Sequence, residues 1–377
     1  MTSSNAPVLV APWRTPIGNA GHGFATSTTT DLAAPVLRAA ADSLRESGCS
    51  DDVDDVVLGN CLGPGGDPAR IAALAAGLGI HVPGVTVDRQ CGSGLDAVMQ
   101  ASMRVRSGDD QLILAGGVES ASTAPWRFWP PVDGADPVRY TRAPFAPNSF
   151  PDPDMGVAAD DLARSRGISR ERQDAYAARS HSLAAAHDFS NEIVPIGVVE
   201  RDQRIRPNMT EQRLARLRPS FTADGTATAG NSCGISDGAA VLAVTTESRA
   251  KELPALRVLG CAVAGSDPAL PGLGPVPAIE KVLRRTGVGL PDIGIVEITE
   301  AFASVVLAVS DELGIDESVL CPQGGAIAMG HPWGASGAIL LVRLAAQMLT
   351  DGGPELGLAA CAIGGGQGIA MIVERAW

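Results

Sequence analysis

The chain has 377 residues, of which 45% are hydrophobic and only 4% aromatic, and its formal net charge is −13. This length predicts two or three domains, or a duplicated one, because a single core seldom grows so large. The acidic balance and the lack of a block of Lys and Arg exclude a general nucleic-acid-binding protein. An anionic substrate would therefore need a local group of basic residues.

The cysteines and the two ends of the chain predict a cytoplasmic protein. Seven cysteines scattered over so long a chain form no disulfide framework and fit a reducing cytosol. The N-terminal segment MTSSNAPVLVAPWRTP lacks the basic and apolar regions of a signal peptide, and the final VERAW is not the usual peroxisomal address. No apolar run of about 18 residues indicates a membrane span.

The first part of the chain alternates between strand-like and helix-like segments. Apolar runs predict strands at 6–12, 54–59 and 111–120, and a short one around Val85. Apolar residues at helical spacing predict helices at 30–47 and 68–78, with Asp31 near the start of the first. This alternation predicts an α/β fold whose parallel sheet is covered on both faces.

Cys91, in VDRQCGSGLDAVMQ, lies where a strand ends and a helix begins. Leu95, Val98 and Met99 recur at helical spacing just after it. Free N–H groups and the positive end of the helix dipole gather at such a point, so we expect a lowered thiol pKa. The adjacent glycines would let a ligand approach the backbone closely. These features fit a nucleophile, whereas a buried structural role is the commoner fate of a lone cysteine.

Residues 125–153 form a long excursion from this pattern, with eight of the chain's 27 prolines. Proline-rich segments do not extend helices or sheets, and loops of this length are usually functional or interfacial. A solvent-exposed linker is the alternative, but linkers seldom carry so much apolar area. The segment contains six aromatic residues: Trp126, Phe128, Trp129, Tyr140, Phe145 and Phe150.

The α/β alternation returns from Leu256 onward. Ser169 is the expected N-cap of an intervening helix, ISRERQDAYAARSHSLAAAHD. PALRVLGCAVAG then predicts a strand, PVPAIEKVLRRTG a helix, and IGIVEITEAFAS a strand leading into a helix. The last part repeats the order found around Cys91: a glycine-rich turn, a helix, a strand and terminal glycines. We interpret this as a weak internal duplication, with two α/β halves on either side of the excursion.

Several segments together resemble the thiolase family over nearly the whole chain. They are RTPIG, CGSGLDAV, AGGVES, TATAGNSCGISDGAA, TEAFA, GGAIAMGHPWGASG and IGGGQG, in this order. The resemblance implies the thiolase fold, in which two similar halves form a layered α-β-α-β-α core with an inserted loop domain. We place the N-terminal half at 1–120, the loop domain for oligomerisation and coenzyme A binding at 121–247, and the C-terminal half at 248–377.

The resemblance also assigns roles at the site. Cys91 matches the nucleophile that takes up the acyl group, and His331, in GHPWG, matches the histidine that activates it. Gly364 matches the glycine whose N–H joins that of Cys91 in an oxyanion hole. Thioester exchange requires such a thiolate, base and donors.

Two positions depart from the family pattern. Thr299 replaces the asparagine of an Asn-Glu-Ala-Phe motif, where the amide holds a water beside the second thioester carbonyl. Ala362 occupies the place of the acid/base cysteine, and Cys361 is one residue earlier. Since neighbouring side chains of a strand point to opposite faces, we expect Cys361 to face away unless a bulge restores it. Ala301 stands where some relatives supply a cysteine instead.

The stretch RIRPNMTEQRLARLRPSFTADGTATAGNSCG matches the part that binds the pantetheine and ADP moieties of coenzyme A. The resemblance places Arg206 near the ADP moiety and Ala229 near the pantetheine, and Arg213 is an extra cation that could meet a phosphate. A surface ion pair is the alternative for either arginine. Cys233 replaces a serine that contacts the pantetheine, and Phe302 is a further expected substrate contact. Asp154 stands where short-chain biosynthetic members often have histidine.

We therefore expect an acyl-CoA acyltransferase that forms an acyl-Cys91 intermediate in Claisen condensation or thiolysis of 3-ketoacyl-CoA. Loss of a positioned acid/base costs about 10²–10⁴-fold, so this step is expected to be impaired. Decarboxylative condensation, or acyl transfer to an oxygen or nitrogen nucleophile, would avoid it. A non-catalytic thiolase-fold subunit is a third alternative. No permanent cofactor, metal, nucleic acid or membrane partner is expected; the substrate is a coenzyme A thioester, and the protein is a homodimer or homotetramer.

Overall fold

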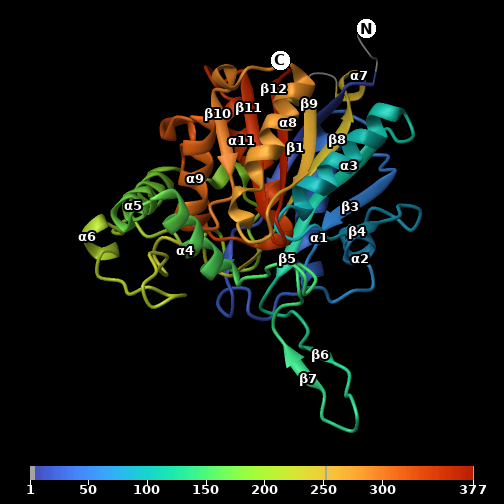
Figure 1. Ribbon diagram of the computed structural model, residues 1–377. Helices are drawn as coiled ribbons and strands as arrows, with labels where there is room; N and C mark the ends of the chain where they lie inside the picture. Colours follow the sequence, from blue (N-terminus) through green and yellow to red (C-terminus); the bar gives the residue numbers. More distant parts are fainter. Residues whose placement is uncertain (1–4, 251–252, 377) are drawn as a thin grey trace.

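A computed structural model describes residues 5–250 and 253–376 (Figure 1). Residues 1–4 and Trp377 lie outside the described part. The N-terminal segment that was searched for a signal peptide begins with these four residues, and the C-terminal VERAW ends with Trp377. The described strands are β1 (Pro7–Arg14), β2 (Gly18–Asn19), β3 (Asp55–Gly59), β4 (Val85–Val87), β5 (Leu112–Ser120), β6 (Arg127–Trp129), β7 (Val138–Tyr140), β8 (Ser236–Thr246), β9 (Leu256–Gly265), β10 (Ile295–Ile298), β11 (Leu356–Ile363) and β12 (Gln367–Arg375).

Helices alternate with these strands in both parts of the chain, as the hydrophobic spacing predicts. Ser169 caps α5 by accepting the N–H of Arg172. The α-helices are α1 (Thr29–Glu46), α2 (Pro68–Ala76), α3 (Ser93–Ser107), α4 (Met155–Arg166), α5 (Arg170–Ala186), α6 (Glu211–Leu214), α7 (Glu247–Ala250), α8 (Pro275–Thr286), α9 (Ala303–Leu313), α10 (Ala326–Met329) and α11 (Trp333–Met348).

The main sheet has two parts that meet at β1. The strand order is β10-β11-β12-β9-β1-β8-β5-β3-β4. The N-terminal part ends at β4 and the C-terminal part at β10, and among the described strands the pairing of Val8 and Leu9 with Arg257 and Leu256 joins them. Each part is therefore a sheet of its own with a short shared seam.

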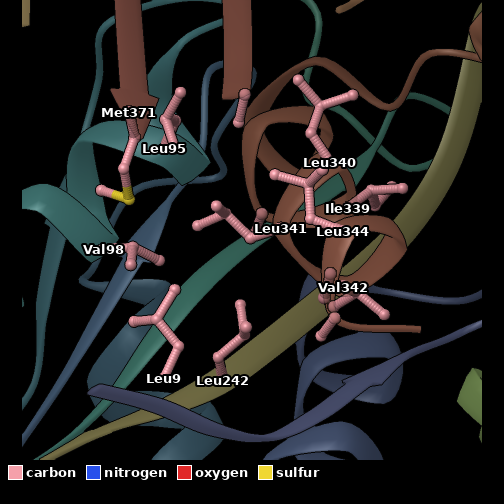
Figure 2. Close-up of a cluster of buried hydrophobic side chains, with 14 of the residues drawn as sticks. Leu9, Leu95, Val98, Leu242, Ile339, Leu340, Leu341, Val342, Leu344 and Met371 are labelled. Carbon is pink, nitrogen blue, oxygen red and sulfur yellow. The ribbon is translucent and has the colours of Figure 1, made fainter. Parts of the chain in front are cut away.

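The helices and sheets form five layers, and three hydrophobic clusters fill the space between them. Helices α1 and α2 pack on the outer face of the N-terminal sheet, and α8 and α9 pack on the outer face of the C-terminal sheet. Helices α3 and α11 lie between the sheets, where Leu95 and Val98 meet Leu341 and Met371 (Figure 2). α11 is buried along almost its whole length, as expected for a largely apolar helix inside the protein.

The sheet is mixed, not parallel as the alternation of strands and helices predicts. Two strands that the sequence analysis does not anticipate, β8 and β12, run antiparallel to both of their neighbours. The glycine turn at 364–366 reverses the chain from β11 into β12, and Gly365 and Gly366 have φ values of +78° and +73°. β8 lies within the segment assigned to the loop domain, yet it sits between β1 and β5 in the N-terminal sheet. Residues 236–246 of the expected loop domain therefore belong to the N-terminal sheet.

The excursion itself contains a hairpin, β6–β7, which extends from the body of the protein at the bottom of Figure 1. Trp129 stacks on Tyr140 with ring centroids 4.5 Å apart, and Arg139 lies over the Trp126 ring. Helices α4, α5 and α6 also belong to the inserted part; α4 and α5 pack beside α9, and α6 packs on α5 (Figure 1).

Candidate active site

The N-termini of α3 and α11 touch each other because glycines occupy the contact. A Cβ on Gly94 would lie 2.8 Å from the carbonyl oxygen of Gly334, and a Cβ on Gly337 would collide with the backbone of Leu95. Cys91 precedes α3 by two residues and His331 precedes α11 by two residues. The close crossing therefore brings the two expected catalytic residues to the same end of the central layer.

Cys91 is partly exposed as a residue, but protein atoms crowd its sulfur. Burial raises the pKa of the Cys91 thiol above its ordinary value, and negative charge on Cys361 and Cys233 would raise it further. The expected lowering by the α3 N-terminus is therefore wrong, because loss of hydration outweighs the helix dipole. The resting group is a thiol, which needs a base to become a nucleophile.

His331 has the protonation state that such a base requires. It is 2% exposed, and burial lowers its pKa to about 4, so the imidazole is neutral at physiological pH. Its Nδ1 lies 2.6 Å from Oγ of Ser336. Its Nε2 is buried and has no hydrogen-bond partner among the described residues. One ring nitrogen is thus held in place and the other is free for proton transfer.

Cys361 lies on the face of β11 that packs against α11 in the central layer, contrary to the expectation that it faces away. It belongs to the same buried cluster as Leu95, whereas Ala362 belongs to the cluster on the other face. The pairing of β11 with β12 is regular from end to end, so no bulge is involved. The alternation of side chains is as predicted, but Cys361 is the residue directed toward the central layer.

Thr299 is the partner of Cys361. Its hydroxyl donates a hydrogen bond to the Cys361 sulfur over 3.2 Å, and both residues are buried. Burial raises the pKa of Cys361 to about 12, and this hydrogen bond opposes the rise. Since the charge of Cys361 also acts on Cys91, the two thiols are close enough to influence each other. Thr299 thus contacts a thiol directly, although the resemblance implies that its position holds a water.

Gly364 directly follows β11, on the turn to β12. A Cβ at this position would lie 2.6 Å from the ring of Phe145, which comes from the inserted part of the chain. The Phe145 ring therefore covers the turn that carries the expected oxyanion donor. Arg142 in turn lies over the Phe145 ring and is paired with Asp154, whose side chain is mostly exposed.

The segment 229–236 runs beside His331. The backbone N–H of His331 donates to the Gly234 carbonyl oxygen, and that of Cys233 donates to the Ala301 carbonyl oxygen. Burial raises the pKa of Cys233 to about 12. Ala229 is exposed, whereas Phe302 is buried and its ring meets that of Phe221 edge-on at 5.7 Å. The segment therefore links the expected pantetheine contacts to the histidine.

Arg206 and Arg213 line one cavity of about 320 Å³, together with Asn208 and Met209. Neither arginine forms an ion pair within residues 5–250 and 253–376. The surface ion pair considered as an alternative is thus absent, and both cations remain open to an anionic ligand. Arg204, nearby, is engaged by three backbone carbonyl oxygens instead.

Comparison with known families settles the relationship. A model of the thiolase N-terminal domain matches residues 7–248, and one of the thiolase C-terminal domain matches residues 253–375. The chain belongs to the thiolase family. A crystal structure of the Bacillus anthracis acetyl-CoA acetyltransferase superposes with a TM-score of 0.91 at 36% identity, over 100% of both chains. The fold is therefore the thiolase fold.

Curated relatives agree over the full length. YhfS of Bacillus subtilis, provisionally named an acetyl-CoA C-acetyltransferase, is 42% identical, covering 97% of this chain and 98% of its own. VraB of Staphylococcus haemolyticus, provisionally given the same activity, is 40% identical over 98% of both chains. A Staphylococcus aureus protein provisionally named an acetyl-CoA acyltransferase is also 40% identical over 98% of both chains.

Two polar residues of this thiolase escaped the sequence analysis. Glu119, at the end of β5, is fully buried and accepts the N–H groups of Gly334, Cys61 and Leu62. It thereby ties the N-terminus of α11 to the N-terminal half. Ser336 holds His331 from inside α11. A charged residue at the end of an apolar strand is a sequence signal that could have identified Glu119. The spacing of His331 and Ser336 in the sequence gives no such signal unless the fold is known.

Proposed function

We propose that this thiolase transfers acyl groups between coenzyme A thioesters through an acyl-Cys91 intermediate. The observation that carries the proposal is the crossing of α3 and α11, which sets Cys91 and the neutral His331 at one end of the central layer. Acyltransferase activity is the common feature of the curated relatives' names.

In the first step, His331 Nε2 takes the proton of the Cys91 thiol, and the sulfur attacks the thioester carbonyl. A carbon–sulfur bond to Cys91 forms, the bond to coenzyme A breaks, and the imidazolium returns its proton to the departing thiolate. The backbone N–H groups of Cys91 and Gly364 stabilise the oxyanion between these events. Such donors are worth roughly 3–4 kcal/mol each in comparable enzymes.

In the second step, we assign the acid/base role to Cys361. As a thiolate it removes the α-proton of a second acyl-CoA, whose carbanion attacks the acyl-Cys91 carbonyl and displaces the Cys91 sulfur. Thiolysis is the reverse, with the Cys361 thiol as proton donor. The hydrogen bond from Thr299 favours the thiolate and so supports this assignment.

Covalent labelling tests the proposal directly. Incubation of the full chain with acetyl-CoA and longer acyl-CoAs should add one acyl group in the intact mass spectrum, located on the Cys91 peptide. The Cys91→Ala variant should remain unlabelled. An adduct on another residue, or no adduct with any acyl chain length, contradicts the proposal. The latter result supports a non-catalytic thiolase-fold subunit instead.

Ala362, at the position of the family's second cysteine, supports a second candidate. Decarboxylation of a malonyl-type thioester yields the carbanion without removal of a proton, so it needs only Cys91, His331 and the oxyanion hole. Acyl transfer to an oxygen or nitrogen nucleophile has the same requirements. Discharge of isotopically labelled acyl-Cys91 by acetyl-CoA supports the first candidate; discharge only by a malonyl thioester, an alcohol or an amine supports the second.

Coenzyme A thioesters are the proposed substrates, with no permanently bound cofactor. The unpaired guanidinium groups of Arg206 and Arg213 suit the phosphates of the ADP moiety. Phe302, Ala229 and Cys233 are the proposed contacts to the acyl-pantetheine arm. No helix in the described part of the chain is long and apolar enough to cross a membrane.

We also propose a cytoplasmic homodimer or homotetramer. Trp126, Val132 and Val138 are 71%, 69% and 62% exposed on the β6–β7 hairpin, and monomers seldom expose contiguous apolar patches of this kind. A second subunit would cover them. All seven cysteines are free, as a reducing compartment requires.

A further inference from the structure

A small cavity lies between β10 and α11, beside Ser336, the hydrogen-bond partner of His331. Its volume is about 20 Å³, which is enough for one water molecule. Glu297 and Thr299 line it from β10, and Ser336 and Arg343 line it from α11. The walls are therefore polar on two opposite sides, as a water site requires.

Two of the polar groups in this cavity are unsatisfied. Glu297 is fully buried; its Oε1 accepts a hydrogen bond of 2.7 Å from Gln347, but its Oε2 has no partner among the described residues. Arg343 binds Glu192 and Gln323 through its terminal nitrogens, while its Nε is likewise without a partner within the described chain. Because buried polar groups are nearly always hydrogen-bonded, a water between Oε2 and Nε is the simplest occupant.

Ser336 connects this cavity to the base. Its Oγ contacts His331 Nδ1 on one side and the cavity on the other. Other helical serines, such as Ser102, donate to the carbonyl oxygen four residues earlier. Ser336 makes no such bond in the part of the chain that the structure describes. Its hydroxyl proton therefore has two available acceptors: His331 Nδ1 or the water in the cavity.

The choice between them decides whether His331 can act as a base. If Ser336 donates to Nδ1, the proton of the neutral imidazole sits on Nε2, which then cannot accept a proton from Cys91. If Ser336 donates to the water, Nδ1–H donates to Ser336 and Nε2 is free to accept. An anionic carboxylate beyond the water accepts its proton and enforces the second arrangement.

We propose that Glu297, acting through one buried water and Ser336, is the positioning residue that fixes His331 as the tautomer with a free Nε2. The proposal rests on the assigned role of His331 as base for Cys91 and extends it to a carboxylate that never touches substrate. The water accepts from Arg343 Nε and Ser336 Oγ and donates to Glu297 Oε2, so it has three partners.

The groups around Glu297 give the relay a measurable signature. Burial raises the pKa of Glu297 to about 7; Arg343 and the hydrogen bond from Gln347 lower it, and Glu300 and Glu192 raise it. The carboxylate is therefore anionic above about pH 7 and enforces the useful tautomer there. Below that pH a protonated Glu297 no longer does so.

The test follows the rate of alkylation of Cys91 by iodoacetamide from pH 5.5 to 9, in the full chain, by peptide mapping. The wild type should show an inflection near pH 7, with faster alkylation above it. Glu297→Gln should abolish the inflection and slow alkylation at pH 8 by about 10–100-fold, as other outer-sphere partners do. Glu297→Asp, which retains the charge, should restore part of the rate and the inflection.

Gln347→Met is the matched variant, because it removes the hydrogen bond that Gln347 donates to Oε1 of Glu297. Loss of that hydrogen bond should move the inflection to higher pH without abolishing it. Cys261 alkylation in the same digest is the internal control and should not change between the variants. A profile for Glu297→Gln that coincides with the wild type, or an inflection that persists, overturns the proposal.

If Glu297→Gln fails to fold, Ser336→Ala is the deciding variant. It removes the hydroxyl that connects the water to His331 and should also abolish the inflection. An inflection that persists in Ser336→Ala overturns the proposal. Alkylation needs no coenzyme A, so its result is independent of the acyl-transfer assignment. A chain that shows the relay but takes up no acyl group contradicts the proposed function and leaves this inference intact.

Discussion

The Thr299 hydroxyl donates a hydrogen bond to the sulfur of Cys361 over 3.2 Å, although Thr299 directly follows β10, Cys361 is on β11, and the two are 62 positions apart. β10 and β11 are parallel neighbours, and Ile298 pairs with Ala360, so the residue after each pair member meets the other just beyond the ladder. The two positions at which the chain departs from the family pattern are thus joined by one hydrogen bond, between Thr299 and Cys361. A hydroxyl paired with a thiol here is coherent chemistry, because the hydroxyl stabilises the thiolate.

Cys361→Ala should therefore impair the step that makes or breaks the carbon–carbon bond. We expect thiolysis of a 3-ketoacyl-CoA to fall by about 10²–10⁴-fold, the usual cost of losing an acid/base group. Acylation of Cys91, measured by intact mass, should persist. Ala362→Cys is the matched variant: a thiol on the other face of β11 should not replace Cys361. A gain with Ala362→Cys and no loss with Cys361→Ala would reverse the assignment.

Gly337→Ala should separate the two catalytic helices. The new methyl group meets the backbone of Leu95, which cannot yield locally, so α11 must move away from α3. A displacement of about 1 Å at the reacting atoms costs on the order of 100-fold in rate, and we expect acylation of Cys91 to fall by at least that factor. Gly265→Ala, where a Cβ meets nothing within 4 Å, is the control and should leave the rate unchanged.

Arg213→Ala should weaken binding of the coenzyme without altering the chemistry. Loss of one charge-assisted contact to a phosphate costs roughly 1.5–3 kcal/mol, which corresponds to an increase in KM of about 10–100-fold. The value of kcat should change little. An acyl thioester of N-acetylcysteamine, which lacks the ADP moiety, should be used equally well by the variant and the wild type. An equal loss with both substrates would contradict a phosphate contact.

Acid should destabilise the fold through His331. The unfolded histidine binds a proton near its ordinary pKa of 6.5, whereas burial lowers the folded pKa to about 4. Unfolding therefore takes up a proton between these pH values, and the stability present above pH 6.5 is lost as pH falls toward 4. At 1.36 kcal/mol per pKa unit the full loss is about 3 kcal/mol. Because the raised pKa of Glu297 acts in the opposite direction, urea unfolding at pH 7 and 4.5 should compare the wild type with His331→Asn, and the variant should lose less stability in acid.

The β6–β7 hairpin should control assembly. Light scattering of the wild type should report an oligomer, and the double variant Trp126→Ser/Val132→Ser should shift it toward the monomer mass of 38.5 kDa. Val198→Ser, at a side chain that is 96% exposed elsewhere, is the control and should not change assembly. Acylation of Cys91 should be the same in both. A wild-type monomer at micromolar concentration would contradict the role of the hairpin.

Sequence periodicity predicted the elements around the site well. α3 begins at Ser93, two residues after Cys91, and α11 follows His331 in the same way, because apolar spacing and glycine turns are local signals. β8 and β12 were not anticipated. Both are almost wholly buried, and a continuous apolar run of that kind does not distinguish a strand from a buried helix.

The errors at the site concern quantities that depend on the whole fold. The pKa of Cys91 was expected to fall because a helix N-terminus is a local feature, but it rises because many distant residues desolvate the sulfur. The face on which Cys361 lies could not follow from alternation alone, which separates it from Ala362 but leaves open which of the two meets α11. Ser336 reaches His331 through the local turn that leads into α11, whereas Glu297 comes close to Ser336 only because α11 packs on β10.

The position of β8 between β1 and β5 also bears on how the protein is made. β1 is synthesised well before its neighbour β8, which ends at Thr246, and before Glu192 and Asp202, the buried partners of Arg14. At 5–20 residues per second, β1 waits on the order of 10–50 s with an unpaired edge. During that interval the nascent N-terminal half is an incomplete sheet whose exposed strand edge is absent from the finished enzyme.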